Sequence, residues 1–439
     1  MEADREGLHR PTDPQSFPLR EADSSASCPT SERLDFPVAV VLPAGGSGER
    51  TGLATPKQFC TFLGRPLISY TIQAFERVTW VKNIVIVVAN ESLDLMKNII
   101  QKHGHKKVKV VLGGPTRHRS IFNGLRVFME SQDDSQLTKP KVVVIHDAVR
   151  PFMEEEFLLK IANAAKEHGA AGAIRPLVST VIATTSEGYL DHSLERTKYR
   201  ASEMPQAFLF DTIYQAYQQC TEYDFEFGTE CLHLVLQYCG TNAKLVEGPP
   251  TLWKVTYIRD LFAAESIIKE NLSQRACVIT GVHQEAVHLT HCLQKTLAQS
   301  MQVDTVSTWH GSDGSSPSTV LENYNLIYIS VNSSSFHEIN KLVETIGNTA
   351  LPVLYPVVLI MMHLSLSECM SFSKTWDELS AIKKLAKEVK ERNILVYGLL
   401  LNYTKDAEKW NDAVENASVI ALSLIKDRNA ALTGQMFVV

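Results

Sequence analysis

The 439-residue sequence predicts an α/β protein made of two successive units, each a mostly parallel sheet with helices between its strands. Three observations predict this class. Short apolar runs alternate with stretches of helical spacing, which is the pattern of repeated strand-helix-strand units. The first apolar run ends in a glycine-rich loop, as a buried parallel strand does when it leads into a turn. A polar stretch at 271–275 divides the series, and a chain of this length needs more than one core.

The first unit is expected to occupy residues 37–274. Its apolar runs and the helical stretches between them predict strands at 37–42, 84–89, 108–112 and 142–145 and helices at 68–78, 93–102 and 120–130. Residues 174–210 change to short β-prone pieces around the turn signal Ser186-Glu187-Gly188, which predicts a β-arm that projects from the sheet. Further pieces complete the unit: helices at 212–219, 229–238 and 260–269 and a strand at 244–248.

The second unit is expected at 275–439. The same alternation predicts strands at 277–279, 326–331, 351–362 and 394–400 and helices at 336–346 and 376–391. Residues 1–36 mix Pro, Ser and charged residues with few apolar positions. Such a segment cannot bury enough surface to offset its ordering entropy, so we expect a disordered tail.

Composition and charge exclude several classes of function. The formal net charge of -6 gives no whole-chain attraction to nucleic acid or to anionic membranes. No apolar run approaches the roughly 20 residues that a membrane span needs. The eight cysteines lack zinc-type pairing, so we expect reduced thiols. The first residues are acidic and carry no apolar signal segment, so we expect a cytosolic protein.

The first candidate site is the loop that follows strand 37–42. Gly45, Gly46 and Gly48 let backbone N–H groups approach phosphate oxygens, and Arg50 and Lys57 can neutralise a triphosphate. The loop fits neither the Walker A motif nor the dinucleotide fingerprint. The alternative is a tight turn that needs glycine only for its backbone conformation.

Two further candidates lie downstream. Asp147 and Arg150 follow the apolar strand 142–145, at the carboxyl end where ligands of open α/β sheets bind. A carboxylate there can bind ribose hydroxyls or a magnesium ion, although it can also cap a helix. Lys254 stands in an apolar stretch, where an unpaired charge is costly. It is either a third cation for the phosphates or a side chain that extends to the surface.

A set of motifs in a fixed order now points to a family. The motifs are Pro56-Lys57-Gln58, Gly113-Gly114 with Arg119-Ser120, His146-Asp147-Ala148-Val149-Arg150-Pro151, Pro205-Gln206, Trp253-Lys254-Val255-Thr256, Asp260-Leu261 and Ala264-Glu265. Together with the glycine-rich loop, they resemble the cytidylyltransferase family that includes the bacterial methylerythritol-phosphate and ribitol-phosphate enzymes. The resemblance covers about residues 37–270 and implies a Rossmann-like nucleotidyltransferase sheet.

The resemblance implies a reaction of CTP with a polyol or sugar phosphate, supported by Mg²⁺. The implied catalytic residues are Arg50, Lys57 and Lys254. The implied CTP-binding residues are Ala44, Gly45, Gly46, Gly48, Gly114, Ser120, Asp147 and Ala148, with Asp147 also matching the metal region. The implied acceptor-binding residues are Arg150, Thr180 and Arg196. Because the β-arm of the family reaches into a partner subunit, the resemblance also implies a homodimer.

Two departures from the bacterial pattern bear on the acceptor. Pro115 stands where many bacterial members have Asp, and Gly228-Thr229-Glu230 replaces a Thr-Asp-Glu sequence near the acceptor. Both departures are compatible with another polyol phosphate. The resemblance, taken together with the long second unit, implies D-ribitol 5-phosphate as the acceptor, giving CDP-ribitol for the O-mannosyl glycan of α-dystroglycan. The alternatives are 2-C-methyl-D-erythritol 4-phosphate, another pentitol or pentose phosphate, or a catalytically silent binding protein that keeps the nucleotide fold.

The second unit resembles the late part of short-chain dehydrogenases, at 385–394 and 432–435. The glycine fingerprint is missing near Thr280-Gly281, and Met370 stands where the family's tyrosine is expected. We therefore expect a degenerate dehydrogenase-like domain that acts as a scaffold without a cofactor. The alternative is an NAD-dependent oxidoreductase.

Overall fold

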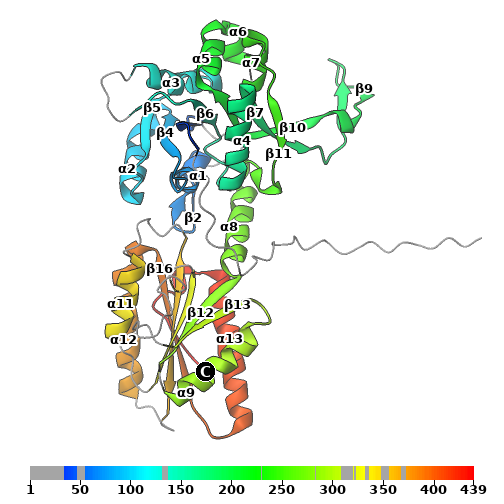
Figure 1. Cartoon of the computed structure of the whole chain (residues 1–439). Helices are drawn as coiled ribbons and strands as arrows, with labels where there is room; N and C mark the ends of the chain where they lie inside the picture. Colours follow the sequence, from blue (N-terminus) through cyan, green and yellow to red (C-terminus); the bar gives the residue numbers. More distant parts are fainter. Residues whose placement is uncertain are drawn as a thin grey trace, which may run out of the picture. The chain divides into compact units, whose positions relative to one another are not determined.

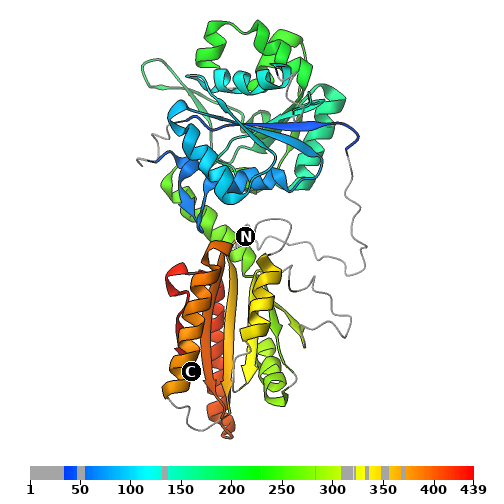
Figure 2. The same ribbon diagram turned by 90° about the vertical axis from the view of Figure 1, so that its left-hand side faces the viewer.

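The computed structural model describes residues 34–46, 55–130, 137–228, 230–281, 283–307, 320, 323–331, 336–347, 355–366 and 372–439. Within these residues, a sheet of seven strands forms in the first part of the chain and a sheet of six strands in the second (Figures 1 and 2). The tail expected at 1–36 lies outside the described residues except for its last three positions.

The first sheet is mostly parallel. In spatial order its strands are β11 (Lys244–Glu247), β7 (Ala170–Pro176), β10 (Arg200–Leu209), β6 (Val142–Ile145), β1 (Val38–Pro43), β4 (Val81–Val88) and β5 (Val108–Leu112). Only β10 runs antiparallel to its neighbours within this described sheet. The carboxyl ends of β1, β4, β5 and β6 therefore share one edge, where ligands of open α/β sheets bind.

Helices cover both faces of this sheet. On one face, the buried cluster that contains Ala39 and Val41 includes side chains of α3 (Arg117–Glu130), α5 (Phe210–Gln219) and α7 (Cys231–Cys239). On the other face lie α1 (Leu67–Glu76) and α4 (Glu155–His168) (Figure 1). Successive side chains of a strand point to opposite faces, so a strand that is covered on both sides needs the continuous apolar sequence seen in β1.

Smaller elements complete this part of the chain. They are the hairpin of β2 (Thr61–Phe62) and β3 (Arg65–Pro66), and the helices α2 (Leu93–His103), α6 (Glu222–Phe227) and α8 (Ile258–Leu272). The predicted β-arm is confirmed as an antiparallel hairpin of β8 (Ile182–Thr184) and β9 (Leu190–Ser193), which projects from the sheet (Figure 1). Its turn contains Gly188 with a φ of 85°, a left-handed conformation that favours glycine.

The second sheet is entirely parallel among the described strands. Its spatial order is β13 (Gln302–Val306), β12 (Arg275–Ile279), β14 (Asn325–Val331), β15 (Val357–Ser365), β16 (Ile394–Asn402) and β17 (Met436–Val438). One face packs on α9 (Gln284–Leu297) and α13 (Ala407–Asp427), and the other on α11 (Phe336–Gly347) and α12 (Phe372–Val389) (Figure 2).

The strand order of the second sheet bears on the dehydrogenase resemblance. The second strand of the unit lies at the edge beside the first, and the later strands follow on the other side. This is the order of flavodoxin-like doubly wound sheets, whereas dinucleotide-binding sheets place a third strand beyond the second. The α/β class of the second unit is confirmed, but its likeness to a degenerate dehydrogenase is not.

The predicted strands and helices are confirmed within a few residues of their expected ends. The first four residues of the strand expected at 351–362 lie outside the described residues. The sequence analysis left α4, α9, α13, β13 and β17 unassigned. No helix in the described ranges has the length and apolar character that a membrane span requires.

Candidate active site

A cavity of about 560 Å³ opens at the carboxyl edge of the first sheet. Its volume lies within the usual range for small-ligand sites, roughly 300–1,000 Å³. It is lined by Pro43, Ala44, Gly45, Gly46, Lys57, Gln58, Gly114, Pro115, Thr116, Arg117, Ser120, Asp147, Ala148, Val149 and Lys254. Four distant stretches of the sequence therefore meet at one site, because β1, β5 and β6 all end there.

The loop after β1 is held in place by Gln58. The Gln58 side-chain amide donates hydrogen bonds to the carbonyl oxygens of Ala44, at 2.8 Å, and Gly46, at 2.9 Å. The Ala44 N–H donates to Val87 O at 2.7 Å, which ties the loop to β4. Lys57 precedes Gln58 and is buried at the cavity wall. The Pro-Lys-Gln motif thus supplies both a cation and the side chain that fixes the loop.

The turn before α3 forms another wall. The Gly114 N–H donates to Ser120 Oγ, and Ser120 Oγ donates to Gly114 O, both at 3.1 Å. A Cβ atom added at Gly114 would lie 2.5 Å from the Cβ of Arg119, so the turn requires glycine there because α3 approaches so closely. Thr116 Oγ1 donates to Phe225 O at 2.6 Å and joins this turn to α6.

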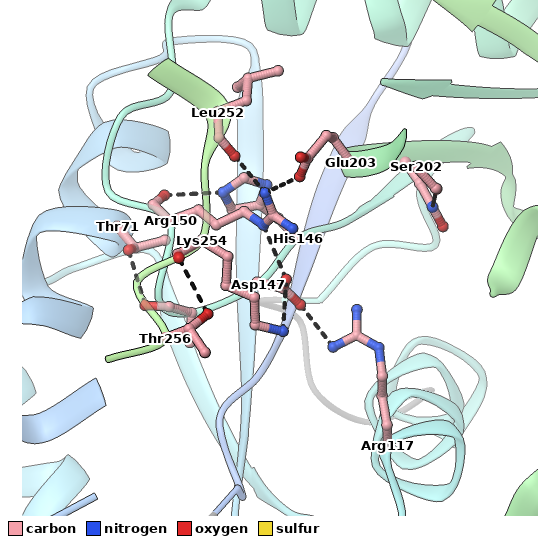
Figure 3. Close-up of polar contacts among 12 residues, drawn as sticks. Thr71, Arg117, His146, Asp147, Arg150, Ser202, Glu203, Leu252, Lys254 and Thr256 are labelled. Atoms are coloured by element: carbon pink, nitrogen blue, oxygen red, sulfur yellow. Dashed lines mark hydrogen bonds and ion pairs between the residues drawn. The ribbon is translucent and has the colours of Figure 1, made fainter. Parts of the chain in front are cut away.

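Asp147 is the electrostatic centre of the cavity (Figure 3). Its Oδ1 accepts a hydrogen bond from Arg117 Nη1 at 2.7 Å. Its Oδ2 lies 3.0 Å from Arg150 Nε and 3.2 Å from Lys254 Nζ. One buried carboxylate therefore contacts three cations that come from three separate elements.

The environment of Asp147 keeps it ionised. Burial alone would raise the pKa of Asp147, but the charges of Arg117, Lys254 and Arg150 outweigh burial and hold the pKa well below its usual range. The neighbouring His146 is fully buried, and burial lowers its pKa to about 4. At neutral pH the strand therefore ends in a neutral imidazole followed by a carboxylate.

Arg150 is engaged away from the cavity and does not line it. Its Nη1 donates to a carboxylate oxygen of Glu203 on β10 and to the carbonyl oxygen of Leu252 (Figure 3). Only 9% of the Arg150 side chain is exposed. Arg150 therefore anchors Asp147 and the segment before Lys254. The contact with the acceptor that the resemblance implied stays a prediction.

The structure brings most of the expected site residues together. Nine of them line the cavity: Ala44, Gly45, Gly46, Lys57, Gly114, Ser120, Asp147, Ala148 and Lys254. Thr180 and Arg196 lie on the β-arm, where both are exposed, and Arg196 donates to Val178 O at 2.7 Å. Gly48 and Arg50 lie outside the described residues.

Sequence reasoning missed Arg117, and it quoted Arg119 only as part of a family motif. Arg119 turns away and pairs with Glu222 and Glu226 of α6, while Arg117 contacts Asp147. Residues two positions apart on a helix point in nearly opposite directions, so only one of these arginines can face the cavity. A prediction that α3 starts at Arg117, directly after the turn, would have found it; the sequence analysis began the helix at 120.

The described residues do not form a metal site by themselves. They contain no cluster of three or more His, Cys, Asp or Glu side chains that could hold an ion. Both oxygens of Asp147 are already occupied by cationic donors. Cytidylyltransferases of the matching family generally depend on a divalent metal. Mg²⁺ is usually held by one or two carboxylates together with substrate phosphates, so Asp147 stays a predicted metal ligand.

Comparison with known families gives two matches. Residues 38–270 match the family described as 2-C-methyl-D-erythritol 4-phosphate cytidylyltransferase. Residues 274–418 match the family described as D-ribitol-5-phosphate cytidylyltransferase C-terminal domain. Among solved structures, the chain is similar to 4-diphosphocytidyl-2C-methyl-D-erythritol synthase from Anaerococcus prevotii DSM 20548, at 25% identity over 53% of this chain and 96% of that chain, with a TM-score of 0.44.

Curated relatives extend over the whole chain. The D-ribitol-5-phosphate cytidylyltransferase of Homo sapiens is 51% identical over 100% of both chains. That of Xenopus tropicalis is 55% identical over 91% of this chain and 97% of its own length. The 2-C-methyl-D-erythritol 4-phosphate cytidylyltransferase of Syntrophus aciditrophicus (strain SB) is 33% identical and covers 53% of this chain. The chain thus belongs to the cytidylyltransferase family that includes the D-ribitol-5-phosphate and 2-C-methyl-D-erythritol 4-phosphate enzymes.

Proposed function

We propose that this chain transfers the cytidylyl group of CTP to D-ribitol 5-phosphate, giving CDP-ribitol and pyrophosphate. One observation carries the proposal: Lys57, Lys254 and Asp147 line the same cavity at the carboxyl edge of a cytidylyltransferase sheet. Cations around a single carboxylate leave the cavity positively charged, which suits a triphosphate and a phosphorylated acceptor.

The proposed reaction is an in-line displacement. An oxygen of the acceptor phosphate forms a bond to the α-phosphorus of CTP, and the bond from that phosphorus to the oxygen bridging the β-phosphate breaks as pyrophosphate leaves. Such transfers depend on positioning and charge neutralisation more than on a covalent nucleophile. Lys57 and Lys254 would stabilise the negative charge that develops on the phosphoryl oxygens, with Arg50 as a further proposed cation.

The choice of ribitol phosphate rests on the relatives. The two relatives that cover 91% and 100% of this chain carry the ribitol name, whereas the named methylerythritol enzyme covers 53% of it. The departures at Pro115 and at 228–230 are compatible with an acceptor other than methylerythritol phosphate. Supply of CDP-ribitol for the O-mannosyl glycan of α-dystroglycan, and a cytosolic location, are parts of the same proposal.

The β-arm supports a homodimer in this proposal. Its apolar side chains are strongly exposed, with 87% for Val178, 70% for Tyr189 and 66% for Leu190. Exposed apolar side chains grouped on one element are typical of an interaction surface. A second copy of the chain would cover them and would bring Thr180 and Arg196 to the partner's acceptor site.

The second unit has a supporting role in this proposal. We place the two domains at 37–274 and 275–439 and assign no redox chemistry to the second. Its described strand order differs from that of dinucleotide-binding sheets, and its match is to the C-terminal domain of ribitol-phosphate enzymes. The scaffold would stabilise the first domain or its dimer.

Pyrophosphate release measured with each acceptor tests the proposal. With CTP and Mg²⁺, we expect a higher kcat/KM for D-ribitol 5-phosphate than for 2-C-methyl-D-erythritol 4-phosphate. The reverse order would assign the chain to the methylerythritol reaction. If no pyrophosphate is released with any pentitol, pentose or tetritol phosphate, the chain is instead a catalytically silent nucleotide-binding protein.

A further inference from the structure

Among the cavity-lining cations whose contacts are described, Arg117 has the largest number of N–H donors that are still available for a hydrogen bond. It lines the cavity, and 30% of its side chain is exposed. A guanidinium has five N–H donors, in a planar fork that matches phosphate oxygens. Within the described part of the chain, Arg117 uses one of them in a hydrogen bond, to Asp147. The remaining donors are available to a ligand.

The two nearby arginines differ in this respect. Arg119 is engaged by Glu222 and Glu226, and its guanidinium lies 5.1 Å from the centre of the Phe225 ring. Arg150 is engaged by Asp147, Glu203 and a backbone carbonyl, and it does not line the cavity. Of these three arginines, Arg117 alone combines open donors with a place at the cavity wall.

The net charge of the site and the anchoring of Asp147 also indicate that Arg117 is available to a ligand. Arg117, Arg150 and Lys254 carry three positive charges against two negative charges on Asp147 and Glu203. Asp147 does not depend on Arg117 for its position, because Arg150 holds it and is itself anchored to Glu203. The excess positive charge at the cavity therefore calls for an anion, and Arg117 can contact one without disturbing Asp147.

We propose that Arg117 binds an oxygen of a substrate phosphate, with Asp147 aiming its guanidinium into the cavity. This inference rests on the proposed function, and it adds a substrate-binding residue that no sequence motif named. Charge-assisted bonds from an arginine fork to phosphate are among the stronger polar contacts in proteins. The triphosphate of CTP and the phosphate of the acceptor share this chemistry, and titration with each ligand separates them.

Calorimetric titration of the full-length chain tests the inference without relying on turnover. CTP and ribitol 5-phosphate are titrated separately into wild type, Arg117→Met and Arg117→Lys. We expect Arg117→Met to weaken one of the two affinities by about 10- to 100-fold, the worth of a lost hydrogen bond to a charged group. Arg117→Lys keeps the charge beside Asp147 but lacks the fork, so it should recover only part of that loss.

The control is Arg126→Met, which removes the same charge from α3 at an exposed pair with Glu130. It should bind both ligands as wild type does. Thermal unfolding verifies that each variant is folded. If Arg117→Met does not fold, the comparison with wild type is made with Arg117→Lys instead. Affinities for both ligands within about twofold of wild type in a folded Arg117 variant would overturn the inference. Absent turnover in wild type would instead overturn the proposed function.

Discussion

Lys57 shows how a single residue joins the fold to the proposed chemistry. It is only 8% exposed, lies at the cavity wall and directly precedes Gln58, which fixes the glycine loop. Lys57 is thus a cation on the wall of the proposed substrate cavity. In the proposed function, Lys57 would lie where charge develops during transfer of the cytidylyl group.

Replacing Lys57 by Ala should lower kcat by about 100-fold or more, since a preorganised electrostatic donor contributes on the order of 3 kcal/mol to a transition state. Steady-state kinetics with saturating CTP and acceptor measure the effect. Lys97→Ala on α2 removes an exposed lysine of the same kind and should leave kcat unchanged. Near-wild-type turnover of Lys57→Ala would contradict the assigned role.

The burial of His146 predicts how the stability of the fold depends on pH. It is fully buried, and its ring Nε2 lies 3.0 Å from Arg150 O, so that nitrogen carries the proton and donates. Its pKa is about 4 in the folded chain, against about 6.5 when unfolded. Between these values the unfolded state binds more protons, so stability falls as pH falls. This one group should remove roughly 2 kcal/mol between pH 7 and pH 5.

Urea unfolding of wild type and His146→Gln at pH 7 and pH 5 measures this contribution. The variant should be less stable at pH 7 but should lose less stability on acidification. His168→Gln, at the exposed end of α4, provides the control and should behave as wild type. An equal loss in wild type and His146→Gln would show that this histidine does not contribute.

At the scale of elements, α3 shows what the sequence does and does not predict. Its apolar spacing predicted a helix, and the apolar runs of β1, β4, β5 and β6 predicted the strands around it. The helix was expected to begin at 120, so Arg117 was not placed on it. In the structure Arg117 lies one turn before the buried Ile121 of α3, at i−4 on the same helix face. The contact between Arg150 and Glu203 could not be predicted for another reason: Glu203 comes from β10, 53 residues later, and local sequence does not report such contacts.

Other elements could have been predicted from the sequence but were not assigned. α4, α9 and α13 repeat apolar residues at helical spacing, as Leu289, Leu293 and Leu297 do in α9. The motifs at Gly45, Lys57, Asp147 and Lys254 were identified because glycine and charge beside apolar runs stand out in sequence. Their convergence on one cavity follows from the order of the strands, which the sequence implied only through its resemblance to a family.

The packing of α3 on the sheet gives a test at this scale. A Cβ atom added at Gly124 would lie 2.7 Å from Val41 Cγ1 and 2.9 Å from Val87 Cγ2, both buried. Gly124→Ala should therefore destabilise the fold by about 1–2 kcal/mol, even though Ala favours helix more than Gly does. Denaturant unfolding measures the change, with Arg126→Ala as a surface control on the same helix. A more stable Gly124→Ala variant would contradict the tight contact.

At the scale of the whole molecule, the β-arm predicts the state of assembly. Light scattering should give about twice the mass of one chain. Replacing Tyr189 and Leu190 of the β-arm by Asp should shift the protein toward monomer, because charges would oppose burial of this apolar surface. If wild type is monomeric, or if the double variant remains dimeric, the arm does not form the interface.

The second domain gives a prediction for the full chain as well. Its described strands lack the arrangement that binds dinucleotides, so NADH should show no saturable binding and no protection against thermal unfolding. A ligand that binds only the folded state stabilises it by RT ln(1 + [L]/Kd), so the unfolding temperature rises with ligand concentration. A clear increase with NADH would restore the oxidoreductase alternative.

The central claim is that the chain transfers the cytidylyl group of CTP to ribitol phosphate in the cavity around Asp147. Its most direct test is product analysis by mass spectrometry after incubation of the chain with CTP, Mg²⁺ and D-ribitol 5-phosphate. We expect CDP-ribitol and pyrophosphate in equal amounts, and neither product from the Lys57→Ala, Lys254→Ala double variant. Absence of CDP-ribitol with wild type, or its formation at an equal rate by the double variant, would contradict the account.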